Sequence, residues 1–259
     1  MLICVKKRQP SVAVSDARGV RSLHVGGEAI QSAMRLGDPF ALYLDYTRCM
    51  MAFLLFHPEP RRALMIGLGG GSLAKYFHKN LRKTSIRVVE LDPRIIAAAR
   101  AQFSLPPDDA RLSVEIGDGA EALAPECCDV LVVDAFHDEE HVPEFASQAF
   151  YDAAFLALAE PGVLVVNFMD DDRNLDANLQ RLEAAFGGAV VAMKALYDPN
   201  VLAFALKGGP HGRPWSVAWD TLRRRAQGLE SGLGLPFTRY LSRLRGMNRC
   251  SAHELIIVP

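Results

Sequence analysis

The feature that most constrains the fold is a regular alternation of short apolar segments and helical stretches that begins at Ala63. The apolar segments read "ALMI", "SIRVVEL", "RLSVEI", "DVLVVD" and "VLVVNF", and we expect a helix after each of the first four. Strands that alternate with helices form parallel sheets. The sequence therefore predicts an α/β protein built on a parallel sheet.

Two more strands complete this pattern. After a predicted helix around "LDANLQRLEAAF" come "AVVAMKAL" and "VLAFAL", which only the turn-rich "YDPN" separates. So short a link permits only an antiparallel pair. Five parallel strands closed by an antiparallel hairpin predict the seven-stranded, Rossmann-like sheet of S-adenosylmethionine-dependent transferases, rather than a six-stranded dinucleotide-binding sheet.

Three units are predicted along the chain. Residues 1–60 form a small N-terminal β-domain, because "SVAVSDARGVRSLHV" predicts a hairpin with its turn at Arg18-Gly19, and "YLDYTRCMMAFLLF" predicts a helix that Pro58 and Pro60 end. Residues 61–207 form the α/β catalytic domain. Residues 208–259 are expected to be helical decoration.

Composition excludes several classes of function. A net charge of -1 over 259 residues gives no general attraction to nucleic acid or to an anionic membrane, and no segment has the roughly 20 apolar residues of a membrane span. The opening "MLICVKKRQP" lacks the apolar stretch of a signal peptide, so we expect a cytoplasmic protein. The five cysteines show no C-x-x-C spacing, which predicts reduced thiols rather than disulfides or a zinc ribbon.

The first predicted strand runs into a glycine-rich turn that opens a helix, "ALMIGLGGGSLAKYF". We expect Gly67, Gly69, Gly70 and Gly71 to let the backbone approach a ligand, and Ser72 to cap the helix. A dinucleotide fingerprint needs glycine at position 72, whereas the looser G-x-G-x-G of nucleoside binding is satisfied. A tight turn of purely structural purpose is the alternative.

Two acids follow the next two strands. Glu90 ends "IRVVEL", where its carboxylate can accept the hydroxyl protons of a ribose, and Asp92 is expected to cap the next helix. Asp118 ends the third strand in "EIGDGAEAL", where it can accept a hydrogen bond from an adenine amino group. Its alternative role is a helix cap. Together with the glycines, these acids predict a nucleoside site at the carboxyl edge of the sheet.

The fourth strand ends in "DVLVVDAFHDEEH". Asp134 closes the strand and is expected to face the sulfur end of the nucleoside, as the catalytic residue. The string from His137 to His141 fits the zinc pattern H-x-x-E-H, but that pattern requires a sustained helix and Pro143 follows directly. We therefore expect no metal. The acids Asp138 to Glu140 form either a solvated loop or a lid that attracts a cationic substrate.

At these residues the chain resembles the spermidine synthase family of polyamine aminopropyltransferases. "FHPEPRRALMIGLGGG", "VVELDPRII", "IGDG" and "CDVLVVDAF" are similar to the motifs of that family in the same order, within a resemblance over about residues 12 to 206. The family implies transfer of an aminopropyl group from decarboxylated S-adenosylmethionine to an amine such as putrescine, with no tightly bound cofactor. It also implies a base at Asp134, a ribose ligand at Glu90 and an adenine ligand at Asp118.

The amine side departs from the family pattern. Gly70 stands where the family has an aspartate for the amino end of the donor, His137 replaces a second aspartate, and Asp45-Tyr46-Thr47 replaces a Tyr-His-Glu run. Asp45, Asp138 or Glu139 can restore the lost charge, and Gln31 is similar to a pocket-lining glutamine of the family, one residue out of register. The predicted substrate-binding residues are Gln31, Asp45, Tyr46, His137 and Asp138.

Two other functions stay open at this point. A methyltransferase on the same scaffold would use intact S-adenosylmethionine, and loss of the aspartate at Gly70 favours such a donor. A nucleoside-binding protein without activity is the third possibility. The expected partner is a small amine acceptor, with no nucleic acid or membrane, and a homodimer is possible.

Overall fold

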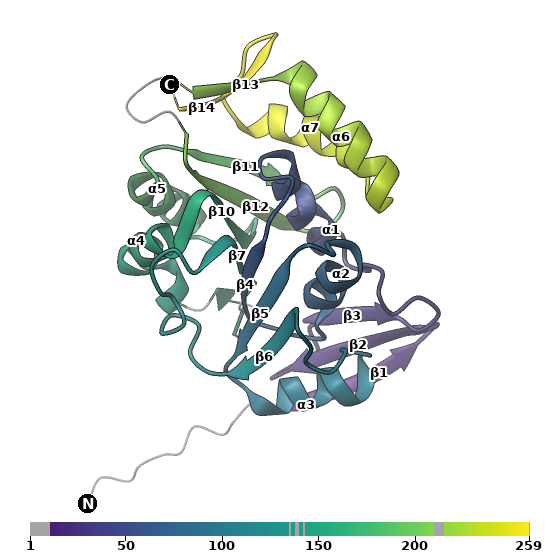
Figure 1. Cartoon of the computed structure of the whole chain (residues 1–259). Coiled ribbons are helices and arrows are strands. Elements are labelled where there is room, and N and C mark those ends of the chain that lie inside the picture. Colours follow the sequence, from purple (N-terminus) through teal and green to yellow (C-terminus); the bar gives the residue numbers. More distant parts are fainter. Residues whose placement is uncertain (1–10, 135, 138–139, 142, 210–214, 259) are drawn as a thin grey trace, which may run out of the picture.

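A computed structural model describes residues 11–134, 136–137, 140–141, 143–209 and 215–258. The strands of its main sheet are β4 (Arg62–Ile66), β5 (Ser85–Glu90), β6 (Leu112–Ile116), β7 (Cys128–Val133), β10 (Leu158–Met169), β11 (Val190–Lys194) and β12 (Asn200–Lys207). They lie in the order β11-β12-β10-β7-β4-β5-β6 (Figure 1). Strands β4, β5, β6, β7 and β10 pair in parallel, and β12 is antiparallel to both of its neighbours. The predicted fold class is confirmed.

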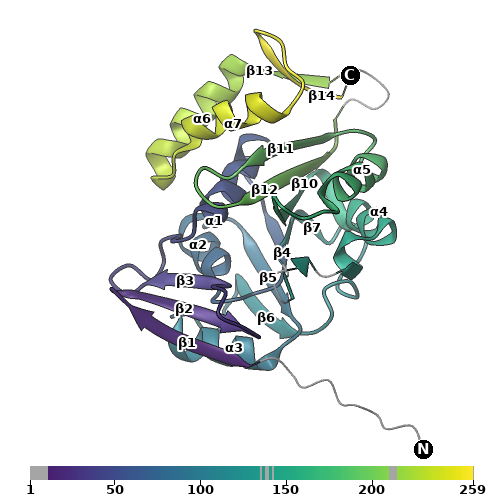
Figure 2. The same ribbon diagram turned by 180° about the vertical axis from the view of Figure 1, so that it is seen from behind.

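Helices cover both faces of this sheet (Figures 1 and 2). One face carries α1 (Asp45–Met50), the 3-10 helix η1 (Met51–Leu55), α2 (Ser72–Asn80), α3 (Pro93–Gln102), α6 (Trp219–Leu233) and α7 (Phe237–Met247), and the other carries α4 (Gln148–Ala157) and α5 (Leu175–Ala185). Side chains alternate between the faces, so that Ala63 and Met65 join the first core and Leu64 and Ile66 the second. Because both faces are buried, the central strands β4, β7, β10 and β12 are mostly apolar.

A small antiparallel sheet precedes the main one, with strands β1 (Val12–Ala17), β2 (Val20–Val25) and β3 (Ser32–Arg35). Arg18 and Gly19 connect β1 to β2 with φ of 50° and 77°. Two successive positive φ values are typical of the turn that matches the twist of a hairpin. The predicted hairpin is confirmed, whereas β3, which packs beside α2, was not predicted.

Other elements also differ from the prediction. The C-terminal residues include a two-stranded sheet of β13 (Trp215–Ala218) and β14 (Glu254–Val258) in addition to α6 and α7. Two short strands, β8 (Phe136–His137) and β9 (Glu140–His141), and the 3-10 helix η2 (Pro143–Ala146) follow β7. The helix predicted after β6 is wrong, because the segment from 117 to 127 forms bends and turns instead. The boundaries at residues 60 and 207 stay a prediction.

The start of α2 corrects one expected cap. Gly71, with φ of 71°, is the residue before the helix, and Ser72 is the first helical residue, whose hydroxyl lies 3.4 Å from that of Ser32. Asp92 does cap α3, since it accepts the amide of Arg94 at 2.8 Å. Within the described ranges, no helix is both long and apolar enough to cross a membrane.

A buried lysine joins the small sheet to the main one. Lys75 of α2 is 1% exposed, and its Nζ donates to the Phe103 carbonyl at 2.6 Å and contacts Met34 Sδ of β3 at 3.2 Å. Both partners are neutral, and burial lowers the pKa of Lys75 to about 8. The lysine therefore fixes the position of Phe103 at the cost of burying an ammonium group.

This cost predicts a rise in stability at alkaline pH. Between the folded pKa of about 8 and the ordinary value of 10.5, the unfolded chain binds more protons at Lys75, so the free energy of unfolding rises with pH, by on the order of 3 kcal/mol in total. Lys75→Met should abolish this rise in chemical unfolding measured from pH 7 to 11. Lys79→Met, at an exposed position of α2, should retain it. Equal slopes in all three proteins would contradict the assignment.

A second prediction concerns the "IGDG" turn after β6. A Cβ atom on Gly119 would lie 2.3 Å from Ile66 Cγ2 of β4, whereas one on Gly117 would lie 3.4 Å from Val89 Cγ1. Gly119→Ala should therefore lower the free energy of unfolding by about 1–3 kcal/mol through overpacking. Gly117→Ala should change it by less than about 1 kcal/mol. Urea unfolding of the two variants side by side measures the difference, and equal stabilities would contradict the close approach of Gly119 to β4.

Candidate active site

The predicted site residues follow four neighbouring strands. Gly67 donates its amide to the Val89 carbonyl at 3.0 Å, Asp134 to Ile66 at 3.1 Å, and Gly117 to Glu90 at 3.1 Å. These bonds extend the pairing of β4 with β5 and β7, and of β5 with β6, by one step beyond the strands. The glycine-rich turn, Glu90, Asp118 and Asp134 therefore lie along one edge of the sheet.

Glu90 holds the glycine-rich turn against the end of β5. It is 8% exposed, and its carboxylate accepts the Leu68 amide at 2.9 Å and the Asp92 amide at 2.9 Å. Burial raises the pKa of Glu90, and the two amides oppose this rise by stabilising the ionised form. Since two donors leave further lone pairs free on a carboxylate, Glu90 retains capacity to accept hydrogen bonds from a ligand.

Asp118 follows β6 and stabilises a turn. Its carboxylate accepts the Ala120 amide at 2.8 Å, which closes a turn rather than capping a helix. Leu91 and Ile116, which follow β5 and end β6, are 72% and 66% exposed. Leu91 adjoins Glu90 in the chain, and Ile116 lies two residues before Asp118. Sequence analysis named neither residue.

Asp134 is the centre of a hydrogen-bond network. Its Oδ2 accepts from the Tyr46 hydroxyl at 3.2 Å, and its Oδ1 accepts from Asn167 Nδ2 at 3.0 Å. Asn167 Oδ1 in turn accepts from Asn200 Nδ2 at 3.0 Å. Burial raises the pKa of Asp134, and the bonds from Asn167 and Tyr46 oppose that rise. The carboxylate is thus held by donors from two elements, α1 and β10.

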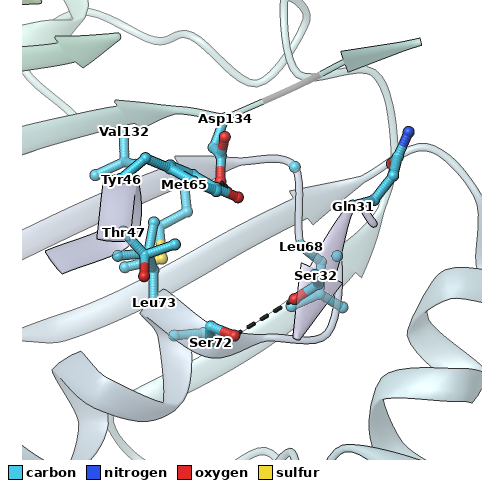
Figure 3. Close-up of a pocket in the computed structure, with 13 residues that line it drawn as sticks. Gln31, Ser32, Tyr46, Thr47, Met65, Leu68, Ser72, Leu73, Val132 and Asp134 are labelled. Atoms are coloured by element: carbon cyan, nitrogen blue, oxygen red, sulfur yellow. Dashed lines mark hydrogen bonds between the residues drawn. The ribbon is translucent and has the colours of Figure 1, made fainter. Parts of the chain in front are cut away.

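A pocket opens between this network and the glycine-rich turn (Figure 3). Its polar side chains come from the small sheet, from α1 and α2, and from the end of β7: Gln31, Ser32, Tyr46, Thr47, Ser72 and Asp134. Gly67 and Gly69 contribute backbone, with φ of 90° and 53°. Three of the predicted residues, Gln31, Tyr46 and Asp134, therefore border one pocket with the glycine turn.

Asp45 lies elsewhere. Its side chain is buried beneath α1, where Oδ2 accepts the Tyr197 amide at 2.7 Å, and it is not among the residues that line the pocket. Tyr46, the next residue, donates its own amide to Asp198 at 3.0 Å. Both bonds tie α1 to residues 195–199, which link β11 to β12. This geometry gives Asp45 a structural role, in place of the predicted contact with substrate.

Gly70 is surrounded rather than open. A Cβ atom on this residue would lie 2.8 Å from Phe103 Cδ1 and 2.8 Å from Ser32 Oγ. The Phe103 ring is fully buried, so it cannot move aside easily. An aspartate at position 70 would therefore require Phe103 and Ser32 to shift. The Ser32 hydroxyl occupies the space in front of Gly70.

Two predicted residues are not placed. His137 belongs to β8, but its side chain is not described, and Asp138 lies outside the described residues. In the string "HDEEH", residues 138 and 139 lie outside the described residues, and the side chains of the other three are not described. Elsewhere, within the part of the chain that is described, no three His, Cys, Asp or Glu side chains gather as metal ligands do.

The hydrogen bonds of Asn167 and Asn200 near Asp134 were not predicted from the sequence. Asn167 is 1% exposed and stands within the apolar run "VLVVNF", and Asn200 is 5% exposed at the start of β12. A buried asparagine in an otherwise apolar strand needs hydrogen-bond partners, so its position was a usable signal. The sequence did not indicate which residues these partners are, because they come from segments far apart in the chain.

Known proteins are similar to this chain in sequence and in architecture. The sequence model of the spermine/spermidine synthase domain matches residues 45–179. A polyamine aminopropyltransferase of Chromobacterium violaceum is 35% identical over 250 residues, which cover 96% of this chain and 94% of that protein. Among solved structures, human methyltransferase-like protein 13 in complex with SAH is 27% identical with a TM-score of 0.66, over 74% of this chain and 93% of that one.

A probable spermidine synthase from Corynebacterium glutamicum has the same fold over 94% of both chains, with 20% identity and a TM-score of 0.70. The domain match spans more than half of the chain, and the relative from Chromobacterium is similar along almost its whole length. The chain therefore belongs to the spermine/spermidine synthase family of transferases.

Proposed function

We propose that the protein transfers an aminopropyl group from decarboxylated S-adenosylmethionine to a small amine such as putrescine. The observation that carries this proposal is the Asp134 carboxylate, which borders a pocket shared with the glycine-rich turn and is held by Tyr46 and Asn167. An amine acceptor requires a carboxylate next to the nucleoside site, because the protonated amine must lose a proton before it can react.

The nucleoside half of the donor is assigned to the edge that β4, β5 and β6 share. Glu90, buried and held by two amides, would accept the hydroxyl groups of the ribose. Asp118 would accept the adenine amino group, and Leu91 and Ile116 would cover the faces of the base. Human methyltransferase-like protein 13, which was solved in complex with SAH, supports a ligand of this class.

The chemistry is a displacement at carbon. An alkylamine has a pKa of about 10, like lysine, so it is protonated at neutral pH and must be neutral to attack. Asp134 takes the proton, the amine nitrogen forms a bond to the carbon beside the sulfonium, and the carbon–sulfur bond breaks. The electron pair of that bond stays on sulfur, and methylthioadenosine leaves. Burial raises the pKa of Asp134 above its ordinary value, which makes its ionised form a stronger base.

The acceptor side is defined less fully. Gln31 and Tyr46 line the pocket, and they support an acceptor bound between the small sheet and α1. Contacts of His137 and Asp138 with the acceptor remain predictions, as do a homodimer and a cytoplasmic location.

A methyltransferase is the second candidate, and Gly70 favours it. The described pocket lining contains one carboxylate, Asp134, which must serve the acceptor, so the amino end of a decarboxylated donor finds the hydroxyls of Ser32 and Ser72 instead. Hydroxyl groups also accommodate the carboxylate of intact S-adenosylmethionine. We therefore expect a weaker preference for the decarboxylated donor than the family motif provides.

Asp134→Asn tests the proposed chemistry. The amide keeps the size of the side chain but cannot take a proton, so turnover of decarboxylated donor with a diamine should fall by about 10²- to 10⁴-fold. The affinity for methylthioadenosine, measured by calorimetry, should change little. Asp171→Asn, an exposed carboxylate after β10, is the control and should keep full turnover. Near-normal turnover of Asp134→Asn would overturn the role of this residue.

Position 70 tests the choice of donor. Gly70→Asp alone should impair folding or donor binding, because its Cβ atom would meet Phe103 and Ser32. In a Ser32→Ala, Phe103→Leu background that makes room, Gly70→Asp should raise the affinity ratio of decarboxylated over intact donor by about tenfold, equal to about 1.4 kcal/mol, since its carboxylate attracts an ammonium and repels a carboxylate. The background without Gly70→Asp is the control. An unchanged ratio in a folded protein means that position 70 does not contact the tail of the donor.

A further inference from the structure

Two buried asparagines extend the hydrogen-bond network of Asp134 across β10 to β12. Asn167 lies on β10, next to β7, and Asn200 is the first residue of β12, opposite Met169 of β10. Neither side chain is accessible to a molecule in the pocket, since the residues are 1% and 5% exposed and neither lines it. Burying two primary amides in an apolar core is unfavourable unless both are hydrogen-bonded. Their position therefore calls for a reason beyond packing.

The hydrogen bond between Asn167 and Asn200 fixes which amide atom of Asn167 faces Asp134. An asparagine amide can present either its oxygen or its nitrogen to a neighbour. Because Asn200 Nδ2 donates to Asn167 Oδ1 at 3.0 Å, that oxygen is engaged, and Asn167 Nδ2 faces Asp134 Oδ1 at 3.0 Å. The reversed amide would set an oxygen against a carboxylate oxygen. Asn200 thus determines that Asp134 receives a donor.

Asn200 is itself held by the residues that link β11 to β12. The backbone carbonyl of Asn200 accepts the Ala195 amide at 2.8 Å, and its side-chain Nδ2 lies 3.5 Å from Met169 Sδ. Asp198 in the same link accepts the amide of Tyr46, whose hydroxyl donates to the other oxygen of Asp134. One short segment therefore supports both donors to the carboxylate.

We propose that Asn167 and Asn200 are positioning residues of the transfer reaction, which orient the Asp134 carboxylate and keep it ionised with a free lone pair toward the pocket. This role rests on the proposed function, in which Asp134 is the base. Neither asparagine touches the substrate. They act through Asp134, and Asn200 acts through Asn167.

The other groups around Asp134 are compatible with this role. From α1, Tyr46 is the titratable group that faces it, and burial raises the pKa of Tyr46 well above its ordinary value, so it stays a neutral donor. The Asp198 carboxylate lies on the far side of Tyr46 and contributes to that rise. From β10, the facing group is the neutral Asn167. The Asn167 amide stabilises the ionised form of Asp134 more than the protonated form. Loss of this amide should therefore raise the pKa of Asp134.

The experiment measures the ionisation of Asp134 in two independent ways. The first is the acidic limb of kcat/KM against pH, and the second is a carbon-13 NMR titration of the Asp134 carboxylate without substrate, assigned with Asp134→Asn. In Asn167→Leu both should move to higher pH by about one unit, because the base then ionises later. Asn200→Leu should move them in the same direction by less.

Asn200→Asp is the sharpest variant. It has the size of asparagine but only accepts hydrogen bonds when ionised, so Asn167 should turn its nitrogen toward position 200 and its oxygen toward Asp134. The shift should then exceed that of Asn200→Leu. Asn178→Leu is the matched control: this asparagine is 2% exposed on α5 and accepts from Arg181, away from the site. It should lower thermal stability without moving either titration.

The outcomes separate the two proposals. A lower turnover in Asn167→Leu or Asn200→Asp with both titrations unmoved would overturn the positioning role, because it would leave only a structural one. Should wild type fail to turn over any donor, the proposed function fails, while the NMR titration still decides the effect on Asp134. If Asn167→Leu does not fold, Asn200→Leu and Asn200→Asp decide the question, and identical titrations in those two variants would count against the proposal.

Discussion

Burial of the main sheet on both faces is the constraint on which the rest of the structure depends. Alternating side chains of β4, β7 and β12 enter two separate cores, so a polar side chain within a strand has no water on either side. Polar groups are accommodated where the strands end or where a buried partner exists. Glu90, Asp118 and Asp134 all stand at such ends, and each accepts at least one hydrogen bond that the protein itself supplies.

The site combines two kinds of preorganisation. At the ends of β5 and β6, backbone amides hold Glu90 and Asp118, so the geometry depends on the course of two turns. At the reactive edge, side chains hold Asp134, so the geometry depends on how α1 and β10 pack. The first arrangement tolerates changes in neighbouring side chains, whereas the second can be altered by a single substitution.

The sequence was sufficient for features that depend on neighbours along the chain. The hairpin turn at Arg18-Gly19, the five parallel strands, the closing hairpin and the cap at Asp92 were all predicted, because each follows from local periodicity or turn chemistry. The helix after β6 was predicted wrongly, because Asp118 closes a turn instead. Asp45, the closed environment of Gly70 and the partners of Asp134 depend on Tyr197, Phe103 and Asn200, which lie 33 to 152 residues away. Pattern alone does not bring such residues together.

The order of the last two strands has a consequence for how such an enzyme can change. Because β12 lies between β10 and β11, the link of residues 195–199 ends beside the site instead of at the outer edge of the sheet. Surface hairpins generally accept insertions and deletions at little energetic cost. This one is different, since Tyr197, Asp198 and Asn200 are bonded to α1 and β10. A change in its length would move Asp134 together with the wall of the pocket that α1 supplies, so substitutions alter this site at lower cost than a longer loop does.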